Sequence, residues 1–281
     1  MAAQPCYRHA ARLTGTSCTR CSRPICPDCM IEAPVGHHCP TCVHEGSADM
    51  RRVRRVAFAG GGRRAATAVV VTALIAVNVA VFLAGLADPS ITRRFADNAL
   101  LVAAGEWYRM VTAAFLHAGL LHLGFNMLGL FVFGTQVEAA LGPARFLALY
   151  LVAAAGGSAC SHFFGAPETF GVGASGAVFG VFGAFYVLAR ARGLDTSQVA
   201  GLIVLNLFIG LAVPGIDNAA HAGGLVTGAV VALGYQQAAR LRGGGEVAAQ
   251  IAAVAGVVAV LVGVTIVRVE QLQPLLRAAL G

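Results

Sequence analysis

The sequence predicts an all-α polytopic membrane protein with a small cysteine-rich domain in front of its helices. Three observations support this fold class. Of the 281 residues, 57% are hydrophobic and only 12% are charged, about half the charged share of a soluble domain. Seven apolar segments of roughly membrane-spanning length follow residue 64. Seven of the eight cysteines precede residue 43.

Residues 1–44 contain four ligand pairs, each with a two-residue gap. The pairs are Cys6 and His9, Cys18 and Cys21, Cys26 and Cys29, and Cys39 and Cys42. Eight ligands suit two tetrahedral zinc ions and leave no open position for catalysis. We therefore expect two structural Zn²⁺ ions, which would replace an apolar core. Interleaved binding would join the first pair to the third and the second to the fourth. His37, His38 and His44 stay open as alternative ligands.

Residues 45–64 form a predicted basic linker directly before the first apolar segment. Its six arginines are Arg51, Arg52, Arg54, Arg55, Arg63 and Arg64. The positive-inside rule then predicts a cytoplasmic N-terminus, a reducing compartment that preserves zinc thiolates. These arginines can also hold anionic lipid headgroups. The net charge of +7 comes from arginines that cluster beside hydrophobic segments, where a membrane surface accounts for them. We therefore expect no nucleic-acid partner.

The apolar segments cover roughly 67–87, 119–140, 145–164, 172–189, 198–213, 219–237 and 247–267. With the N-terminus inside, Arg145, Arg190 and Arg240 fall at cytoplasmic connections, whereas the outer loops 165–171 and 214–218 contain no arginine. The long first outer loop, 88–118, does contain arginines, and we expect it to be partly structured at the interface. We expect a six-helix core over 65–240, and an extra helix with an outer tail over 241–281.

Polar residues recur at one depth in three of these segments. Ser175 and His221 each fall a few residues inside an inward-running segment, on the order of 5–10 Å below the outer surface. His122 and Asn126 share one helix face by their spacing of four, and His117 precedes them at the outer mouth. Ionisable groups inside a membrane are costly and are functional candidates. This shared depth predicts one site.

These residue types suit acyl transfer. The Ser175 hydroxyl needs a base, which His221 can supply. Side chains of His122 and Asn126, with the Ser175 backbone N–H, can stabilise an oxyanion. The nearest acid, Asp217, lies in the loop before its helix, so a Ser–His dyad is favoured over a triad. No cofactor is needed for this chemistry.

Small residues line both segments that carry the dyad. Gly176 and Gly180 are spaced by four, as are Ala220, Gly224 and Gly228. Such spacing permits close helix contact, which would bring the serine and the histidine together.

Over about 67–237 the sequence resembles the rhomboid family of intramembrane serine proteases. The motifs are Trp107-Tyr108-Arg109, His117-x4-His122-x3-Asn126, Gly134-x3-Glu138-x3-Gly142, Gly173-Ala174-Ser175-Gly176 and Ala220-His221-x2-Gly224. The resemblance implies an endopeptidase that cleaves transmembrane substrates near the outer face. It implies Ser175 as nucleophile, His221 as base, and His122, Asn126 and the Ser175 amide as the oxyanion site. His117, Trp107, Arg109, Glu138, Gly173, Gly176 and Gly224 match structural positions.

Phe179 departs from that pattern, because many bacterial relatives carry a tyrosine stacked on the base histidine. A phenyl ring can still stack, so we expect activity to survive. The segment 247–267 resembles the extra C-terminal helix of some members, and the N-terminal module resembles a B-box-type zinc finger. We expect a bacterial cell membrane, and a cytoplasmic protein partner for the module.

Two other function classes stay open. An inactive relative that binds membrane proteins for quality control would have lost Ser175 or His221, and both are present. A metal transporter would show inverted repeats and carboxylates at the membrane midplane, which the sequence lacks.

Overall fold

The computed structural model describes residues 3–33, 35–46, 68–241 and 245–280. Contacts divide the chain into two compact units, Met1–Gly62 and Arg63–Gly281. Residues 47–67 lie outside the described part. All six arginines of the predicted linker, and the first residue of the first predicted segment, fall there.

The first unit is built from short hairpins around buried cysteines. Strand β1 (Gln4–Pro5) pairs antiparallel with β2 (Leu13–Thr14), and β3 (Ile31–Glu32) pairs with β4 (His37–His38). A single 3₁₀ turn, η1 (Pro27–Cys29), lies between the two hairpins. The buried cluster consists of Ile25 and six cysteines. Because strands of two residues bury almost no apolar surface, something other than a hydrophobic core must hold this unit.

The second unit is helical. Its long helices are α2 (Val69–Ala87), α8 (Pro143–Phe164), α9 (Ser175–Ala191), α10 (Ser197–Ala212), α11 (Asn218–Ala238) and α12 (Gly245–Leu280). The predicted helical character and the presence of several apolar helices are thus confirmed. Within the described ranges, four helices are long and apolar enough to cross a membrane: Val69–Ala87, Leu120–Leu141, Pro143–Phe164 and Gly245–Ala278. The count of six helices plus one stays a prediction.

Two segments, 119–140 and the predicted tail, differ in detail from the sequence expectation, whereas the loop 88–118 is partly structured as expected. The segment 119–140 consists of α6 (Leu120–Gly129), a π-helical turn, η3 (Leu130–Gly134), and α7 (Thr135–Leu141). The loop 88–118 contains α3 (Ser90–Phe95), α4 (Ala99–Ala103), α5 (Arg109–Thr112) and the 3₁₀ turn η2 (Ala113–Phe115). Helix α12 continues through the predicted tail to Leu280.

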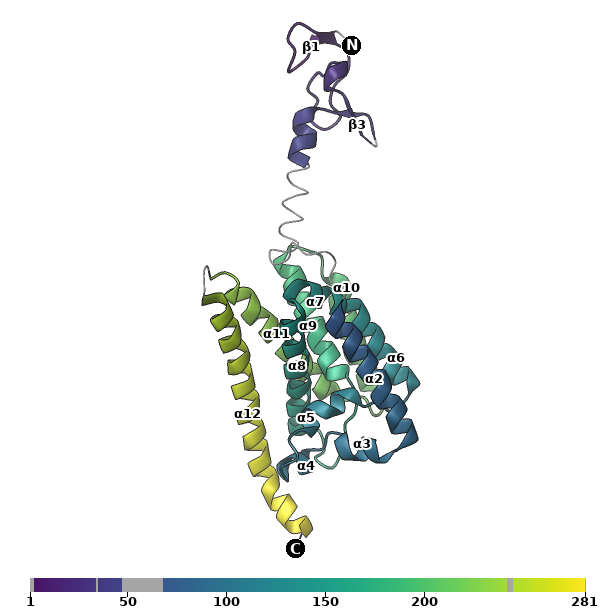
Figure 1. The fold of residues 1–281 in the computed structure, drawn as a ribbon, viewed down its shortest axis with the longest axis vertical. Coiled ribbons are helices and arrows are strands. Elements are labelled where there is room, and N and C mark those ends of the chain that lie inside the picture. The colour runs from purple at the N-terminus through teal and green to yellow at the C-terminus, as the bar shows by residue number, and fades with distance from the viewer. Residues whose placement is uncertain (1–2, 34, 47–67, 242–244, 281) are drawn as a thin grey trace. The chain divides into compact units, whose positions relative to one another are not determined.

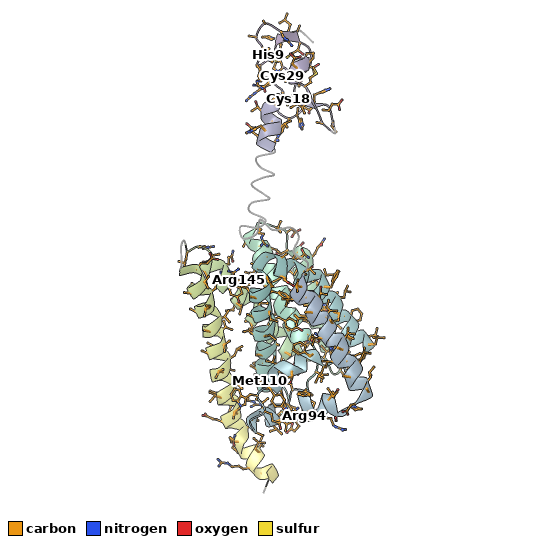
Figure 2. All side chains as sticks on the ribbon, viewed as in Figure 1. His9, Cys18, Cys29, Arg94, Met110 and Arg145 are labelled. Carbon is orange, nitrogen blue, oxygen red and sulfur yellow. The ribbon has the colours of Figure 1, made fainter. Side chains whose placement is uncertain are left out.

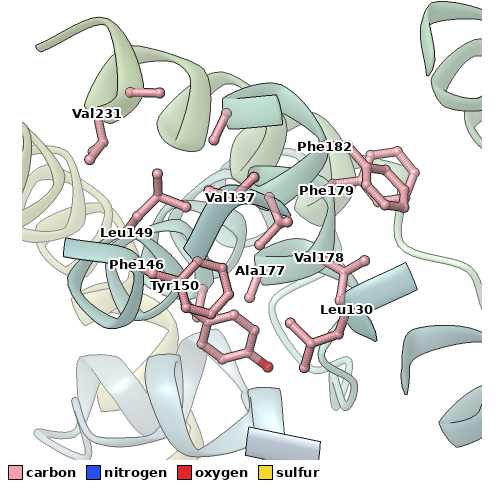
Figure 3. Packing of buried hydrophobic residues seen from close by; sticks show 14 of the residues in the cluster. Leu130, Val137, Phe146, Leu149, Tyr150, Ala177, Val178, Phe179, Phe182 and Val231 are labelled. Carbon is pink, nitrogen blue, oxygen red and sulfur yellow. The ribbon is translucent and has the colours of Figure 1, made fainter. Parts of the chain in front are cut away.

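The core of the second unit surrounds α9, which contacts α8 and α11 extensively (Figures 1 and 3). More than half of the α9 residues are buried, from Gly176 to Ala189. A helix that is apolar on every side is typical of a protein interior. In contrast, Leu121, Phe125 and Phe208 on α6 and α10 are exposed, as expected for faces that contact lipid. Helix α9 is therefore held in the interior, in contact with α8 and α11.

Candidate active site

Ser175 is the first residue of α9 and is half-buried. Two residues earlier, Gly173 has φ = +133°, a conformation that favours glycine. A Cβ atom on Gly173 would lie 2.6 Å from Nε2 of His122 and 3.8 Å from Oγ of Ser175. Only glycine therefore fits, and the serine hydroxyl and the His122 imidazole both lie within 4 Å of one point beside it.

His221 lies one turn into α11, beside the first turn of α9. Its ring stacks on Phe179, with ring centroids 4.2 Å apart and an interplanar angle of 7°. Because Phe179 follows Ser175 by one helical turn, this stack fixes His221 next to the serine. The His221 side chain is only 7% exposed, and its Nδ1 atom has no hydrogen-bond partner. Within the described ranges, no hydrogen bond joins the Ser175 hydroxyl to the His221 ring.

The nearby carboxylate of Asp217 has other partners. It accepts hydrogen bonds from the Ala220 backbone N–H (2.9 Å) and from the Ser161 hydroxyl. Asp217 therefore caps α11, and among the described residues no carboxylate forms a hydrogen bond or ion pair with the His221 ring.

Glycines bring the two helices together. A Cβ atom on Gly180 would lie 3.0 Å from the carbonyl oxygen of Gly224, and one on Gly176 would lie 3.3 Å from that of Ala220. Gly157 of α8 completes the contact, because its Cβ would lie 2.9 Å from the Ala220 oxygen. The spacing of small residues suggested the first two contacts. Gly157 was missed, although Ala153 and Ser161 lie four residues to either side of it, a spacing of small residues that could have pointed to this contact.

The remaining site residues lie on or just before α6. The Ala118 backbone N–H donates to Nδ1 of His122 at 3.5 Å, so a neutral ring carries its proton on Nε2, toward Ser175. The Asn126 side chain donates one amide hydrogen to the His122 carbonyl at 2.9 Å and keeps a second donor. His117 packs edge-on against His122, with ring centroids 5.1 Å apart.

The motif residue Arg109 stabilises the loop 88–118 through hydrogen bonds. Arg109, 5% exposed, donates to Glu106 (2.7 Å) and to the carbonyls of Arg93 (3.0 Å) and Ala96 (2.8 Å). Hydrogen bonds from the Tyr108 hydroxyl and from Arg109 hold the pKa of Glu106 below its usual range. The bonds of Arg109 thus join the second half of the loop 88–118 to its first half. Trp107, beside them, is 38% exposed.

Glu138 caps the start of α2, at a distance from the site. Its buried carboxylate accepts hydrogen bonds from the backbone N–H groups of Val70 (3.0 Å) and Val71 (2.8 Å). A carboxylate at a helix N-terminus satisfies free donors and complements the helix dipole.

One buried pair, His162 and Asp97, is not apparent from the sequence. Nε2 of His162 on α8 lies 2.9 and 3.0 Å from the two carboxylate oxygens of Asp97, and both side chains are less than a tenth exposed. The position of His162 inside an apolar segment could have drawn attention to it, because ionisable groups in membrane segments are candidates for functional residues.

The first unit gathers its ligands into two groups, and Figure 2 labels His9 and Cys29 of one group and Cys18 of the other. One consists of Cys6, His9, Cys26 and Cys29, the other of Cys18, Cys21, Cys39 and Cys42, and within each group all ligand atoms lie within 4.8 Å of one another. The grouping joins the first pair to the third and the second to the fourth, with His9 as the histidine ligand.

The ligand distances test whether zinc fits. Sulfur atoms about 2.3 Å from a tetrahedral zinc ion are about 3.8 Å apart. The Sγ atoms of Cys21 and Cys39 are 3.7 Å apart. Nδ1 of His9 lies 3.3 Å from the sulfur of Cys26 and 3.4 Å from that of Cys29. The donor sets and their spacing suit two closed metal sites.

Comparisons with known proteins give one family. The Rhomboid domain model matches residues 104–238. Rhomboid protease GluP of Bacillus subtilis (strain 168) is 42% identical over 146 residues, which cover 49% of this chain and 28% of GluP. Rhomboid protease AarA of Providencia stuartii is 30% identical over 199 residues, or 58% of this chain and 70% of AarA. RHOMBOID-like protein 5 of Arabidopsis thaliana is 35% identical over 154 residues, or 52% of this chain and 50% of that relative. The chain thus spans less than two thirds of GluP and of the plant protein.

Proposed function

The chain belongs to the rhomboid family, and on this premise we propose that it is an intramembrane serine endopeptidase. Its family and its several apolar helices make it an integral membrane protein. The proposed substrates are transmembrane proteins in the lipid bilayer, cut near the outer face of the membrane.

In the proposed mechanism, the Ser175 hydroxyl oxygen attacks the carbonyl carbon of the scissile peptide, and His221 takes the hydroxyl proton. The carbonyl oxygen becomes negative and accepts hydrogen bonds from His122, Asn126 and the Ser175 backbone N–H. The C–N bond then breaks, and His221 gives its proton to the departing amine. Water repeats the attack on the acyl-enzyme, which releases the new carboxylate and restores the serine.

The observation that carries this proposal is the parallel stack of His221 on Phe179, one turn from Ser175. A flat aromatic stack limits the ring to motion in its own plane, so His221 stays beside the first turn of α9. No hydrogen bond joins the serine hydroxyl to the histidine ring among the described residues. Such bonds are often long before substrate arrives.

We further propose the architecture and orientation that the sequence suggests. A six-helix core over 65–240 carries the site, and α12 is the extra helix of 241–281. Residues 1–44 are the zinc module and 45–64 the linker, with the N-terminus in the cytoplasm of a bacterial cell. Ser175 and His221 then open toward the outside, which supplies the water for hydrolysis.

For the first unit we propose two structural zinc ions, one in each ligand group. Cys6, His9, Cys26 and Cys29 would hold one ion, and the second group the other. Zinc there would supply folding free energy in place of an apolar core, and no catalytic step. The resemblance to a B-box finger favours binding of a cytoplasmic protein partner.

The alternative is an inactive relative that binds membrane proteins. The two functions are distinguished by cleavage of a reporter with one transmembrane segment, reconstituted with the wild type, Ser175→Ala or His221→Ala. Either substitution should lower the cleavage rate by more than about a thousandfold. Ser197→Ala is the matched control, because this exposed serine also begins an apolar helix.

Each outcome decides between the functions. Cleavage by the wild type and by Ser197→Ala, but by neither site variant, would support the protease. Cleavage that survives in Ser175→Ala would refute the nucleophile assignment. A wild type that cleaves none of several reporters and is not labelled by a fluorophosphonate would favour the inactive relative.

A further inference from the structure

Helix α12 is attached to the outer end of the core at three places. The Arg268 side chain donates to the carbonyl of His162, at the end of α8, with a distance of 2.7 Å. The Gln273 amide donates to the Ala103 carbonyl at 3.3 Å. Leu272, 2% exposed, packs between Ala99 and Ala103 of α4. The lower half of α12 in Figure 1 accordingly lies beside α4 and α8.

The His162 side chain continues this connection into the loop 88–118. Its Nε2 atom lies within 3.0 Å of both carboxylate oxygens of Asp97. The pair borders a cavity of about 190 Å³, which Ser161, Asp217 and Gly171 also line. A polar pair this buried is strongly held, because loss of either partner leaves the other unsatisfied.

Asp97 in turn holds the segment that leads to the serine. Its backbone N–H and carbonyl each bond the Gly171 backbone, both at 2.9 Å. Two residues later, the Gly173 N–H donates to the Ala113 carbonyl at 3.0 Å. Ser175 follows directly. A continuous series of bonds therefore runs from α12 to the turn that places the nucleophile.

We propose that Arg268, His162 and Asp97 form a tether by which α12 positions the Gly171–Ser175 turn for the reaction. These are positioning residues, since none contacts the reacting atoms. The tether rests on the proposed protease function and extends it, because it gives the extra helix a role in the active site. The tether holds the serine hydroxyl and the Gly173 backbone against His122, where an oxyanion would form.

The tether predicts a change in kcat with KM unchanged, which a contact that only stabilises the fold does not predict. Loosening the turn misplaces the serine without altering the surface that receives substrate. In His162→Gln and Asp97→Asn, kcat for the reporter should fall about tenfold with KM unchanged, since misplacement of 1 Å can cost about a hundredfold. The rate at which a fluorophosphonate acylates Ser175 should fall by the same factor. The double variant should be no slower than the slower single variant, because both changes break one connection.

The experiment uses the full chain in proteoliposomes, with Arg277→Gln as the matched control. Arg277 is an exposed arginine on the same helix, and its variant should keep wild-type kcat. Arg268→Gln should lower kcat about threefold and tests the outer link alone. Arg268→Gln also provides the test of the tether if His162→Gln and Asp97→Asn do not fold.

Three results would overturn the tether. They are an unchanged kcat in folded His162→Gln and Arg268→Gln, a loss that appears in KM alone, or multiplicative losses in the double variant. A wild type that neither cleaves nor reacts with the fluorophosphonate would instead refute the proposed function, and the tether with it.

Discussion

Gly157→Ala adds one methyl group at the point where three helices meet beneath the candidate site. The new Cβ would lie 2.9 Å from the Ala220 carbonyl oxygen and 3.3 Å from the Gly176 Cα atom. Both obstacles are backbone, so no side chain can rotate away. The helices themselves must separate, by about half an ångström to restore ordinary contact.

The cost follows from this displacement. Overpacking of a tight core destabilises by about 1–3 kcal/mol, partly offset by about 0.5–1 kcal/mol that alanine gains over glycine inside a helix. We therefore expect a net loss of about 1 kcal/mol, within a range of about 0–2.5 kcal/mol. Gly176 adjoins Ser175 and Ala220 adjoins His221, so the same shift separates the proposed dyad. If 1 Å costs about a hundredfold in rate, half of that costs about tenfold.

The assay pairs reporter cleavage with thermal unfolding in detergent. Gly201→Ala on α10 is the matched control, because a Cβ there meets nothing within 4 Å. It should raise the unfolding temperature slightly and leave kcat unchanged. A Gly157→Ala protein with wild-type kcat and stability would refute the close three-helix contact and its link to the site.

Three further substitutions test other parts of the chain. Phe179→Leu keeps most of the buried volume but removes the flat ring beneath His221, so kcat should fall about tenfold while stability falls by less than about 1.5 kcal/mol. Glu138→Gln removes the charge that caps α2 and should lower stability by about 1–3 kcal/mol, read from unfolding in detergent. Cys29→Ser should reduce the zinc content, measured by atomic emission, from two ions per chain to one, whereas Cys160→Ser should leave it unchanged.

Matched controls separate these effects from general damage. Phe133→Leu alters an aromatic contact with Phe182 that does not involve His221, and should preserve kcat. Glu270→Gln changes an exposed carboxylate and should leave stability unaltered. An equal zinc content in Cys29→Ser and the wild type would contradict the grouping of ligands, and equal stability in Glu138→Gln would contradict the cap.

The candidate site could be predicted from the sequence because two kinds of information agreed, the residue types and their predicted depth in the membrane. Ser175, His221 and His122 stood out because polar groups are rare in apolar segments and because topology assigned them one depth. His162 is equally polar, but its partner Asp97 lies in a loop far away in sequence, so no local spacing linked them. The pairing appears only when the loop 88–118 folds back onto α8.

Helix boundaries were predictable to within a few residues where hydropathy changed sharply, as at both ends of α8. The π-helical turn at Leu130–Gly134 could not be predicted, because its residues are at least as apolar as the helical turns on either side of it. The continuation of α12 through Arg268 was missed because its last turns are polar and are held by contacts with α4. In the first unit the sequence pointed to His9 as the eighth ligand, but spacing alone could not establish which pairs share an ion. The folded hairpins place Cys6 and His9 with Cys26 and Cys29.

The unequal lengths of the peripheral helices have a consequence for the surrounding bilayer. Helix α10 has 16 residues and is about 24 Å long, whereas α12 has 36 and is about 54 Å long. In the proposed architecture, in which α10 also spans the membrane, a hydrocarbon layer of about 30 Å would thin where it meets α10, while α12 would reach beyond it or tilt. The protein would then impose a gradient of membrane thickness across its own diameter. Single-span proteins with short apolar stretches would gather on the thin side, so the lipid itself would sort candidate substrates of the proposed protease before any of them reaches the site.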